Sequence, residues 1–329
     1  MKDETKNSDI LLSVQNLQVD YSSNGQTVRA VNGVSFDLNN GQSLGLVGET
    51  GAGKTTIAKA ILQILPDHST KRAEGTITFK GKSLMEIKEH ELQNIRGSQI
   101  SMVFQDPMTA LNPVMTVGEQ IAEGIRHHQG LDKAKAKQEA IKMLETVGIS
   151  RDRIDEYPHQ FSGGMKQRVV IAIALACNPE LLIADEPTTA LDVTIQAQVL
   201  DLIKDLREKK GTSLILITHD LGVVADTCDK VAVVYAGEIV EIGALEEVFD
   251  HPTHPYTRGL FGAIPDMYKD VARLSPIEGL PPNPTDLPEG CYFAARCPHA
   301  TDECRAKHCQ LEHMSGTHFV RCLKKEQEG

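Results

Sequence analysis

The chain has 329 residues, enough for one large domain or two modest ones with a buried core. Its hydrophobic fraction of 40% and charged fraction of 24% are ordinary for a soluble globular protein. The formal net charge of -11 argues against nucleic-acid binding, which needs a basic face. The apolar runs are too short for a membrane span, and the charged start is unlike a secretory signal. We therefore expect a cytosolic chain that reaches any membrane through partners.

The pattern of apolar residues changes along the chain. Within residues 11–38, Asn, Gly and Ser separate short β-type runs at 12–14, 17–19 and 31–36. From residue 44 short apolar strands alternate with helical segments, which is typical of a parallel α/β sheet. Residues 115–162 are mostly helical, with one helix expected over 134–147. Residues 275–290 are too rich in Pro and Gly for regular structure.

A glycine-rich loop follows the apolar strand 44–47 and precedes a helical run at 56–65. Glycines let backbone N–H groups curl around phosphate oxygens at a helix N-terminus, where the helix dipole favours anions. Lys54 supplies a point charge to the β- and γ-phosphates, and the Thr55 hydroxyl is placed to bind Mg²⁺. Such a turn could match by chance, but the flanking strand and helix favour a phosphate loop. The expected ATP-binding residues are Gly48, Glu49, Thr50, Gly51, Ala52, Gly53, Lys54, Thr55 and Thr56.

An apolar run at 181–184 leads into two adjacent carboxylates. Two acids at the end of a core strand are costly to bury unless each has a partner. Asp185 fits the acid that holds Mg²⁺, and Glu186 fits the base that orients the attacking water. The alternative is that Asp185, Glu186 and Pro187 open a surface turn. The phosphate loop earlier in the chain favours the catalytic interpretation.

Two further strands end in polar residues. Residues 100–104 lead into Gln105, and residues 214–217 lead into Thr218 and His219. Ligands of open α/β sheets bind at the carboxyl ends of strands, so we expect these groups at one edge with Gly48 and Glu186. Gln105 can contact Mg²⁺ or the lytic water, and His219 can hydrogen-bond the γ-phosphate. A lone Gln or His at a strand end is more often structural.

The turn Ser162-Gly163-Gly164 lies between the phosphate loop and the acidic strand. With it, residues 11–250 resemble the ATP-binding-cassette (ABC) ATPases, in which these motifs occur in this order. The resemblance implies that the turn acts on ATP held by a second subunit and that Asp192 belongs to the D-loop. It also places Tyr21 where relatives stack an aromatic ring on adenine, although Tyr21 could be an ordinary strand residue. Met165 departs from the Gln found in many relatives.

Seven cysteines are present, of which Cys177 and Cys228 are isolated and are interpreted as small core residues. The other five lie between residues 291 and 322, and in a reducing compartment such clustering indicates metal or cluster ligation. This tail and the run 254–257 resemble the C-terminal extension of oligopeptide, dipeptide and nickel importer ATPases, and residues 160–168 resemble their D-type subunit.

Some members of that subfamily bind a [4Fe–4S] cluster through four tail cysteines. The matching residues are Cys291, Cys297, Cys304 and Cys322, with five, six and seventeen residues between successive positions. Cys309 is extra, and the nearby His308, His313 and His318 keep zinc open as an alternative. Free thiols or an air-formed disulfide are the remaining interpretations.

The resemblance implies an α/β P-loop ABC core (a mixed sheet with an antiparallel β subdomain) and a small irregular cysteine-bearing extension. We expect a tail at 1–10, a nucleotide-binding domain at 11–250 with a helical subdomain at about 106–165, and the extension at 251–329.

The implied function is ATP hydrolysis that powers import of dipeptides or oligopeptides. The implied partners are a paralogous second ATPase, two transmembrane permease subunits and an extracytoplasmic substrate-binding protein, at the cytoplasmic face of a bacterial membrane and without nucleic acid. Import of nickel or a metal chelate is one alternative. A soluble ABC protein acting on DNA or ribosomes is another, and a third makes the tail a metal-responsive interaction module.

Overall fold

The computed structural model describes residues 9–188, 193–262 and 277–324. The chain forms two compact units, and the segments of the two units alternate along the sequence. Unit 1 comprises Met1–Asp9, Asn39–Ser43 and Glu86–Ile217, and unit 2 comprises Ile10–Leu38, Leu44–Met85 and Thr218–Gly329.

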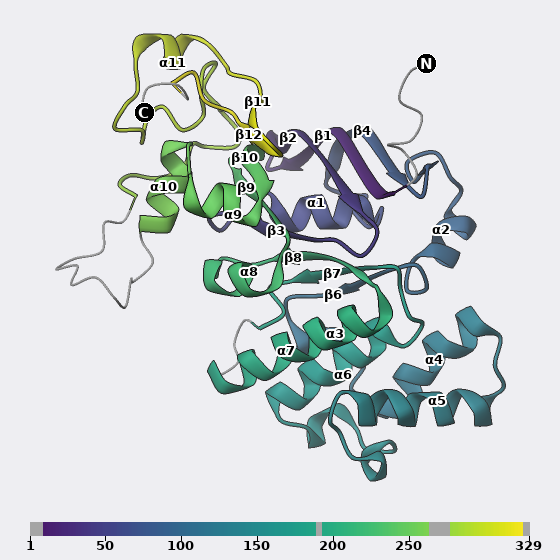
Figure 1. The fold of residues 1–329 in the computed structure, drawn as a ribbon. Coiled ribbons are helices and arrows are strands. Elements are labelled where there is room, and N and C mark those ends of the chain that lie inside the picture. Colours follow the sequence, from purple (N-terminus) through teal and green to yellow (C-terminus); the bar gives the residue numbers. More distant parts are fainter. Residues whose placement is uncertain (1–8, 189–192, 263–276, 325–329) are drawn as a thin grey trace, which may run out of the picture. The chain divides into compact units, whose positions relative to one another are not determined.

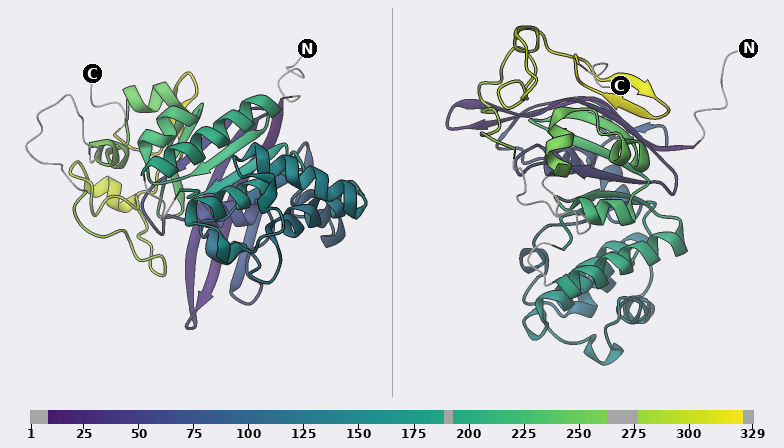
Figure 2. Two further views of the ribbon diagram at one scale, coloured as in Figure 1. Left: turned by 90° about the horizontal axis from the view of Figure 1, so that it is seen from below. Right: turned by 60° about the vertical axis from the view of Figure 1, so that its left-hand side comes forward.

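Unit 2 contains an antiparallel sheet with the strand order β2-β1-β4-β5. Its strands are β1 (Ile10–Ser23), β2 (Gln26–Asn39), β4 (Thr70–Phe79) and β5 (Lys82–Ser83). In Figure 2 the purple strands β1 and β2 are long ribbons that run side by side. Leu17 and Val19 of β1 are fully buried, whereas Gln18 between them is only half-buried, so one face of the strand forms core.

The sequence predicted several short strands within residues 11–38, and this was wrong, because β1 and β2 are each 14 residues long. Asn16, which was expected to separate two runs, lies inside β1 at a positive φ of 50°. The pairing of β1 with β4 shifts register between Gln15 and Gln18, as at a β-bulge, and then continues to Tyr21. A turn-type residue therefore bends this strand without ending it.

A second, mixed set of strands in unit 2 has the order β11-β12-β10-β9-β3. β3 (Ser43–Val47) pairs parallel with β9 (Lys230–Tyr235), and the remaining neighbours are antiparallel. Those neighbours are β10 (Glu238–Ala244), β11 (Glu312–Ser315) and β12 (His318–Val320). The helices of the unit are α1 (Lys54–Ile61), α8 (Leu221–Thr227), α9 (Leu245–Asp250), α10 (Pro255–Gly262) and α11 (Asp302–Ala306) (Figure 1).

Unit 1 contains three parallel strands in the order β8-β7-β6. They are β6 (Ile100–Val103), β7 (Leu181–Asp185) and β8 (Ser213–Ile217), and every residue in them is buried, as expected of a parallel sheet. The helices are α2 (Glu89–Ile95), α3 (Pro107–Ala110), α4 (Val117–Gln129), α5 (Lys133–Thr146), α6 (Gly163–Leu175) and α7 (Val193–Lys210). Two 3₁₀ turns, Arg151–Arg153 and Pro158–Gln160, lie between α5 and α6.

Local sequence explains where the helices of unit 1 begin. Thr116 and Glu119 form a reciprocal capping box at the start of α4, and Gly130 ends that helix in the left-handed region. The Asp132 side chain accepts a hydrogen bond from the Lys135 N–H and so caps α5. The helix expected over 134–147 is therefore confirmed within one residue at each end.

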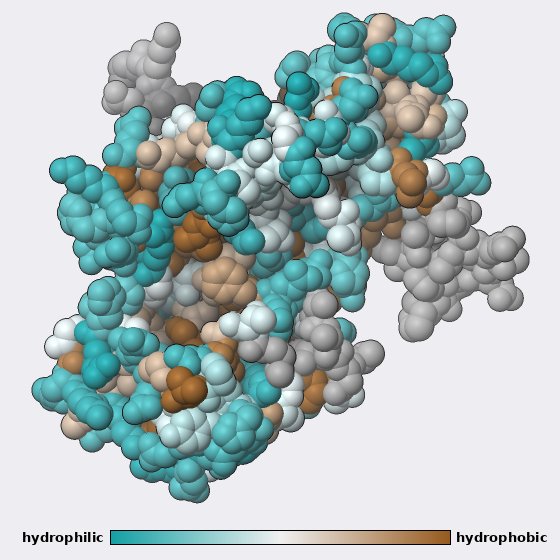
Figure 3. Space-filling view, turned by 180° about the vertical axis from the view of Figure 1, so that it is seen from behind, coloured by the Kyte–Doolittle hydropathy of each residue, from teal (hydrophilic) through white to brown (hydrophobic). Residues whose placement is uncertain are grey.

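Hydrophilic side chains cover most of the face drawn in Figure 3, with brown apolar patches between them. Within the described ranges, no helix has both the length and the hydropathy needed to cross a membrane. The proline-rich connector has neither helix nor strand over residues 277–290, as expected, and its first two residues lie outside the described ranges.

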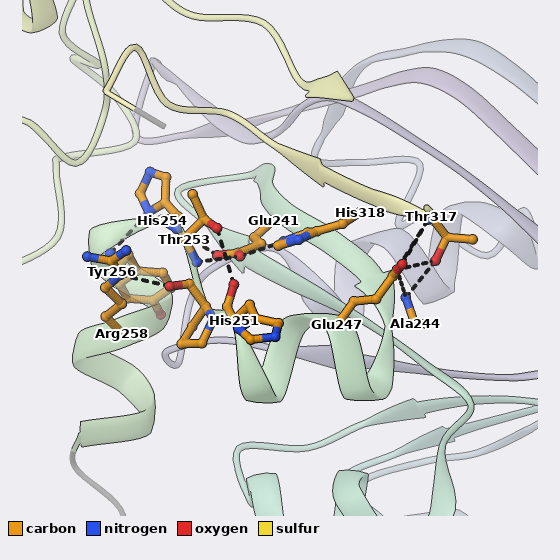
Figure 4. Close-up of polar contacts among 11 residues, drawn as sticks. Glu241, Ala244, Glu247, His251, Thr253, His254, Tyr256, Arg258, Thr317 and His318 are labelled. Atoms are coloured by element: carbon orange, nitrogen blue, oxygen red, sulfur yellow. Dashed lines mark hydrogen bonds and ion pairs between the residues drawn. The ribbon is translucent and has the colours of Figure 1, made fainter. Parts of the chain in front are cut away.

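A buried glutamate of β10 forms hydrogen bonds with two parts of the C-terminal segment. Glu241 of β10 is 0% exposed, and its carboxylate accepts the backbone N–H groups of Thr253 at 2.7 Å and His254 at 2.9 Å. His318 of β12 places Nε2 2.7 Å from the same carboxylate (Figure 4). One carboxylate thus joins β10, the segment before α10 and the last strand.

Glu241→Ala is expected to lower the free energy of unfolding by about 3 kcal/mol, because it removes the acceptor of two backbone N–H groups and of the buried His318 imidazole. Thermal unfolding measures the loss, and hydrogen exchange at residues 318–320 locates it. Glu246→Ala, which removes an exposed carboxylate of α9, is the control. If both variants unfold at the same temperature, Glu241 does not have this role.

Candidate nucleotide-binding site

Backbone atoms confine the glycine-rich loop between β3 and α1. Gly48 has φ 151°, and a Cβ there would lie 2.1 Å from the Val234 carbonyl oxygen. Gly53, which caps α1, has φ 103°, and its Cβ would lie 2.4 Å from the Ala30 carbonyl oxygen. Glycine is therefore required at both positions, by conformation and by space.

The lysine of the loop is folded back onto the loop. Lys54 is only 6% exposed, and its ammonium donates to the carbonyl oxygens of Gly48 at 2.7 Å and Glu49 at 3.0 Å. These contacts hold a positive charge inside the loop, at the N-terminus of α1. An anion bound there would meet the lysine, the loop N–H groups and the helix dipole together.

A turn that sequence reasoning missed supports the same loop. The Gly237 N–H, in the β9–β10 turn, donates to the Ala52 carbonyl at 2.9 Å. Asn32 of β2 bonds both residues of that turn, through its N–H to Gly237 and its side-chain amide to Ala236. The only signal in the sequence was an Ala-Gly pair between two apolar runs.

Tyr21 lies at the end of β1, and its hydroxyl is 3.5 Å from Thr56 Oγ1 at the first turn of α1. Unit 2 therefore brings together the aromatic residue and the phosphate loop that the sequence predicted as parts of one site. His219 is exposed, and the following Asp220 caps α8 by accepting the N–H groups of Gly222 and Val223.

Unit 1 brings together two more of the predicted residues. The Gln105 side-chain amide, directly after β6, donates to the Glu186 carboxylate at 3.0 Å. Asp185, the last residue of β7, is only 2% exposed. Glu186 has a positive φ of 45°, held by its N–H bonding the Ile217 carbonyl at 2.8 Å. A non-glycine residue kept in this conformation is a common sign of a functional site.

The Ser162 turn is exposed at the start of α6. Ser162 and Gly163 are exposed, and the Ser162 hydroxyl accepts the Met165 N–H at 3.4 Å and caps the helix. Met165 is held in turn, because its sulfur accepts from Arg153 Nη1 at 3.1 Å. The D-loop prediction, Ala190, Leu191 and Asp192, lies outside the described residues.

Five cysteines of the C-terminal tail line one small cavity of about 30 Å³, little more than the space of one water. His254, Phe293 and His299 also line it. Within the described ranges, no three His, Cys, Asp or Glu side chains are grouped so that they could hold a single metal ion. The five thiols are Cys291, Cys297, Cys304, Cys309 and Cys322, so Cys309 shares the cavity with the four predicted ligands.

The environment of this cavity shifts the acidity of its thiols. A hydrogen bond with the Cys309 thiol, together with burial, raises the pKa of Cys291 to about 12. The same hydrogen bond lowers the pKa of Cys309. Burial raises the pKa of Cys297 and of Cys322, and neighbouring thiols add to the effect. Outside the tail, Cys228 is buried as predicted, whereas Cys177 is only half-buried.

Comparisons with known proteins match both parts of the chain. Residues 31–189 match the family model described as ABC transporter, and residues 240–304 match that described as Oligopeptide/dipeptide transporter, C-terminal region. The dipeptide transport ATP-binding protein DppD of Bacillus subtilis is 50% identical over 319 residues, which cover 96% of this chain and 95% of the relative. The chain belongs to this family of ABC transporter ATP-binding subunits.

Other relatives and solved structures agree with this assignment. The oligopeptide transport ATP-binding protein OppD of Salmonella typhimurium is 47% identical over 323 residues, which cover 98% of this chain and 96% of the relative. The dimeric ATP-binding cassette MJ0796, solved in a post-hydrolysis state bound to ADP and phosphate, has a TM-score of 0.65 at 26% identity and covers 71% of this chain and 99% of its own. This ABC subunit is therefore an ATPase with the cassette fold, as the sequence predicted.

The close contacts of the ABC subunit's phosphate loop can be tested without nucleotide. We expect Gly53→Ala to lower the free energy of unfolding more than Gly51→Ala, measured by thermal unfolding. Both residues have positive φ, which costs a non-glycine residue about 1–2 kcal/mol, but a Cβ at Gly51 has no atom within 4 Å. If the two variants unfold at the same temperature, the backbone of Ala30 does not confine the loop.

Proposed function

We propose that this chain is the ATP-hydrolysing subunit that powers import of dipeptides or oligopeptides through a membrane permease. The observation that carries this proposal is the match of residues 240–304 to the C-terminal region of oligopeptide and dipeptide transporters. The cassette MJ0796 covers 71% of this chain, whereas the relatives with peptide-transport names cover 96% and 98% of it. The proposed domains are the cassette at 11–250, with its helical part at about 106–165, and the extension at 251–329.

In the proposed site, separate groups bind the phosphates, the adenine and Mg²⁺. Lys54 and the loop at residues 48–56 bind the phosphates, through backbone N–H groups other than those of Glu49 and Ala52, which bond within the protein. Tyr21 stacks on the adenine. The hydroxyl of Thr55, the amide oxygen of Gln105 and the carboxylate of Asp185 are hard oxygen donors of the kind that Mg²⁺ prefers. When bound, Mg²⁺ neutralises charge that develops on the phosphates.

Glu186 is the proposed general base, which orients and deprotonates the attacking water. Its hydrogen bond with Gln105 supports this role, because it fixes the direction of the carboxylate. His219 follows β8 and is exposed, and its proposed role is to hydrogen-bond the γ-phosphate and respond to its loss.

The turn Ser162, Gly163 and Gly164 is proposed to act on ATP held by a second, paralogous ATPase, and Asp192 is assigned to the D-loop. The exposure of Ser162 and Gly163 supports this, since a turn that serves another subunit must reach its own surface. Three large hydrophobic side chains of unit 1 are also exposed: Phe104 at 42%, Val114 at 79% and Tyr157 at 41%. We propose that the helical part of unit 1, which carries Val114 and Tyr157, contacts the two permease subunits.

The remaining partner is an extracytoplasmic substrate-binding protein, and the location is the cytoplasmic face of the membrane. We further propose that Cys291, Cys297, Cys304 and Cys322 hold a [4Fe–4S] cluster. Thiols around one cavity are the ligand set of such a cluster. Zinc is the alternative occupant of these thiols.

Glu186→Gln is expected to lower ATP hydrolysis about 10²- to 10⁴-fold in the assembly with permease and partner ATPase, because the amide cannot accept the proton of water. ATP binding should persist, measured with a fluorescent nucleotide. Glu208→Gln, an exposed position in α7, is the matched control. Undiminished hydrolysis by the Glu186 variant, measured with a partner site that is itself inactive, would show that another group is the base.

Anaerobic purification is expected to yield about four iron and four sulfide per chain, with visible absorbance. Cys297→Ser should reduce both contents, whereas Cys177→Ser outside the tail should leave them unchanged. Zinc bound without sulfide would refute the cluster.

A further inference from the structure

One residue of the phosphate loop is bound by the C-terminal extension. The Glu49 carboxylate forms a bidentate ion pair with Arg296, with Nη1–Oε2 and Nη2–Oε1 both at 2.9 Å. The two residues are 247 positions apart in the sequence and belong to the same unit. The Arg296 side chain is only 6% exposed, so this pair is unlike a solvated surface contact.

The backbone of the same residue is held as well. The Glu49 N–H donates to the Tyr256 hydroxyl at 2.9 Å. Tyr256 lies in α10 and is fully buried, and its own N–H donates to His254 Nδ1 at 3.0 Å. Figure 4 shows Tyr256 beside His254, whose N–H is in turn bound by the buried Glu241. The hydroxyl that meets Glu49 therefore belongs to a fully buried residue, which is held through His254 and Glu241.

These contacts lead directly to the phosphate-binding lysine. The Glu49 carbonyl accepts the Lys54 ammonium at 3.0 Å. Glu49 thus has its side chain bound by Arg296, its N–H by Tyr256 and its carbonyl by Lys54. A shift of Glu49 would move one of the two loop oxygens that hold the lysine.

Arg296 is itself fixed on several sides. Its Nε donates to the Glu278 carbonyl at 3.0 Å, and Nη1 and Nη2 reach the Tyr235 hydroxyl and the Ile277 carbonyl at 3.3 Å. The guanidinium also lies 5.7 Å from the ring centroid of Tyr235 and 6.0 Å from that of Phe293. Its orientation is therefore set before it meets Glu49, which is how an arginine positions a carboxylate.

We propose that Arg296 and Tyr256 are positioning residues for nucleotide binding, through which the C-terminal extension holds the phosphate loop in the conformation that receives ATP. This inference rests on the proposed role of Lys54. The affinity for ATP then depends on residues of the extension that touch no nucleotide.

The test uses the full chain in its assembly with permease and partner ATPase, the partner site being inactive. Glu49→Gln and Arg296→Lys each remove the bidentate pair while keeping side-chain length. We expect each to raise the KM for ATP about tenfold with kcat within a factor of two, because the loop would then hold its ATP-binding conformation for a smaller fraction of the time. The KM of the double variant should be no higher than that of the single variant with the higher KM, because both changes remove the same ion pair.

Tyr256→Phe is a second, nearly isosteric probe, which deletes only the acceptor of the Glu49 N–H and should also raise KM. The matched control is Arg305→Lys, because Arg305 pairs with Asp302 on the exposed surface of the same extension. It should leave KM unchanged. Thermal unfolding without nucleotide separates these effects from loss of fold, since Glu49→Gln leaves the extension's own contacts in place.

Unchanged KM in Glu49→Gln and Arg296→Lys, or effects that simply multiply in the double variant, would overturn the inference. Lys54→Ala distinguishes this from failure of the proposed function. If Lys54→Ala abolishes ATP binding while the pair variants bind normally, only the positioning role is wrong. If Lys54→Ala still binds ATP with wild-type affinity, the proposed nucleotide site is wrong, and with it the inference that rests on it.

Discussion

The phosphate loop depends on close backbone packing that only glycine permits. At Gly48 and Gly53 the loop approaches the carbonyl oxygens of Val234 and Ala30 so closely that a methyl group has no space. Because those carbonyls belong to β9 and β2, two different sheets of unit 2 set the path of the loop. The lysine then turns back onto carbonyls of this path, so its position follows from the packing of strands and not from the helix alone.

The extension is joined to this framework by buried charges. Glu238 and Glu241 of β10 are 4% and 0% exposed, and each meets cationic or imidazole groups from the tail. Glu238 lies 2.8 Å from His308 and 3.6 Å from Arg321, and the Arg321 side chain also donates to the Ile239 and Cys309 carbonyls. Buried charges are costly unless they are paired, so these pairs hold the tail against β10.

Local patterns predicted much of this fold, and distant partners explain what they missed. Strands followed by Gly48 or Gln105 were found because apolar runs ending in polar residues carry their own signal. Glu238 and Glu241 could not be predicted as buried, since their partners lie about 12 to 80 positions further along the chain. The bulge at Asn16 was misjudged for a related reason: pairing with β4 decides whether a turn-type residue ends a strand.

The same limit applies to the candidate site. Motif reasoning finds residues that would face the nucleotide, such as Lys54 and Glu186, because their chemistry demands particular types in a short stretch. Tyr256 and Arg296 were noticed only as parts of segments that resemble the importer ATPases, since neither belongs to a motif that binds phosphate. Their contacts with Glu49 became visible only when the extension was placed in space. Arg296 directly precedes Cys297, which lines the thiol cavity, so one short segment of backbone serves both the loop and the thiols. A change that displaced this segment at the cavity would therefore act on the phosphate loop as well.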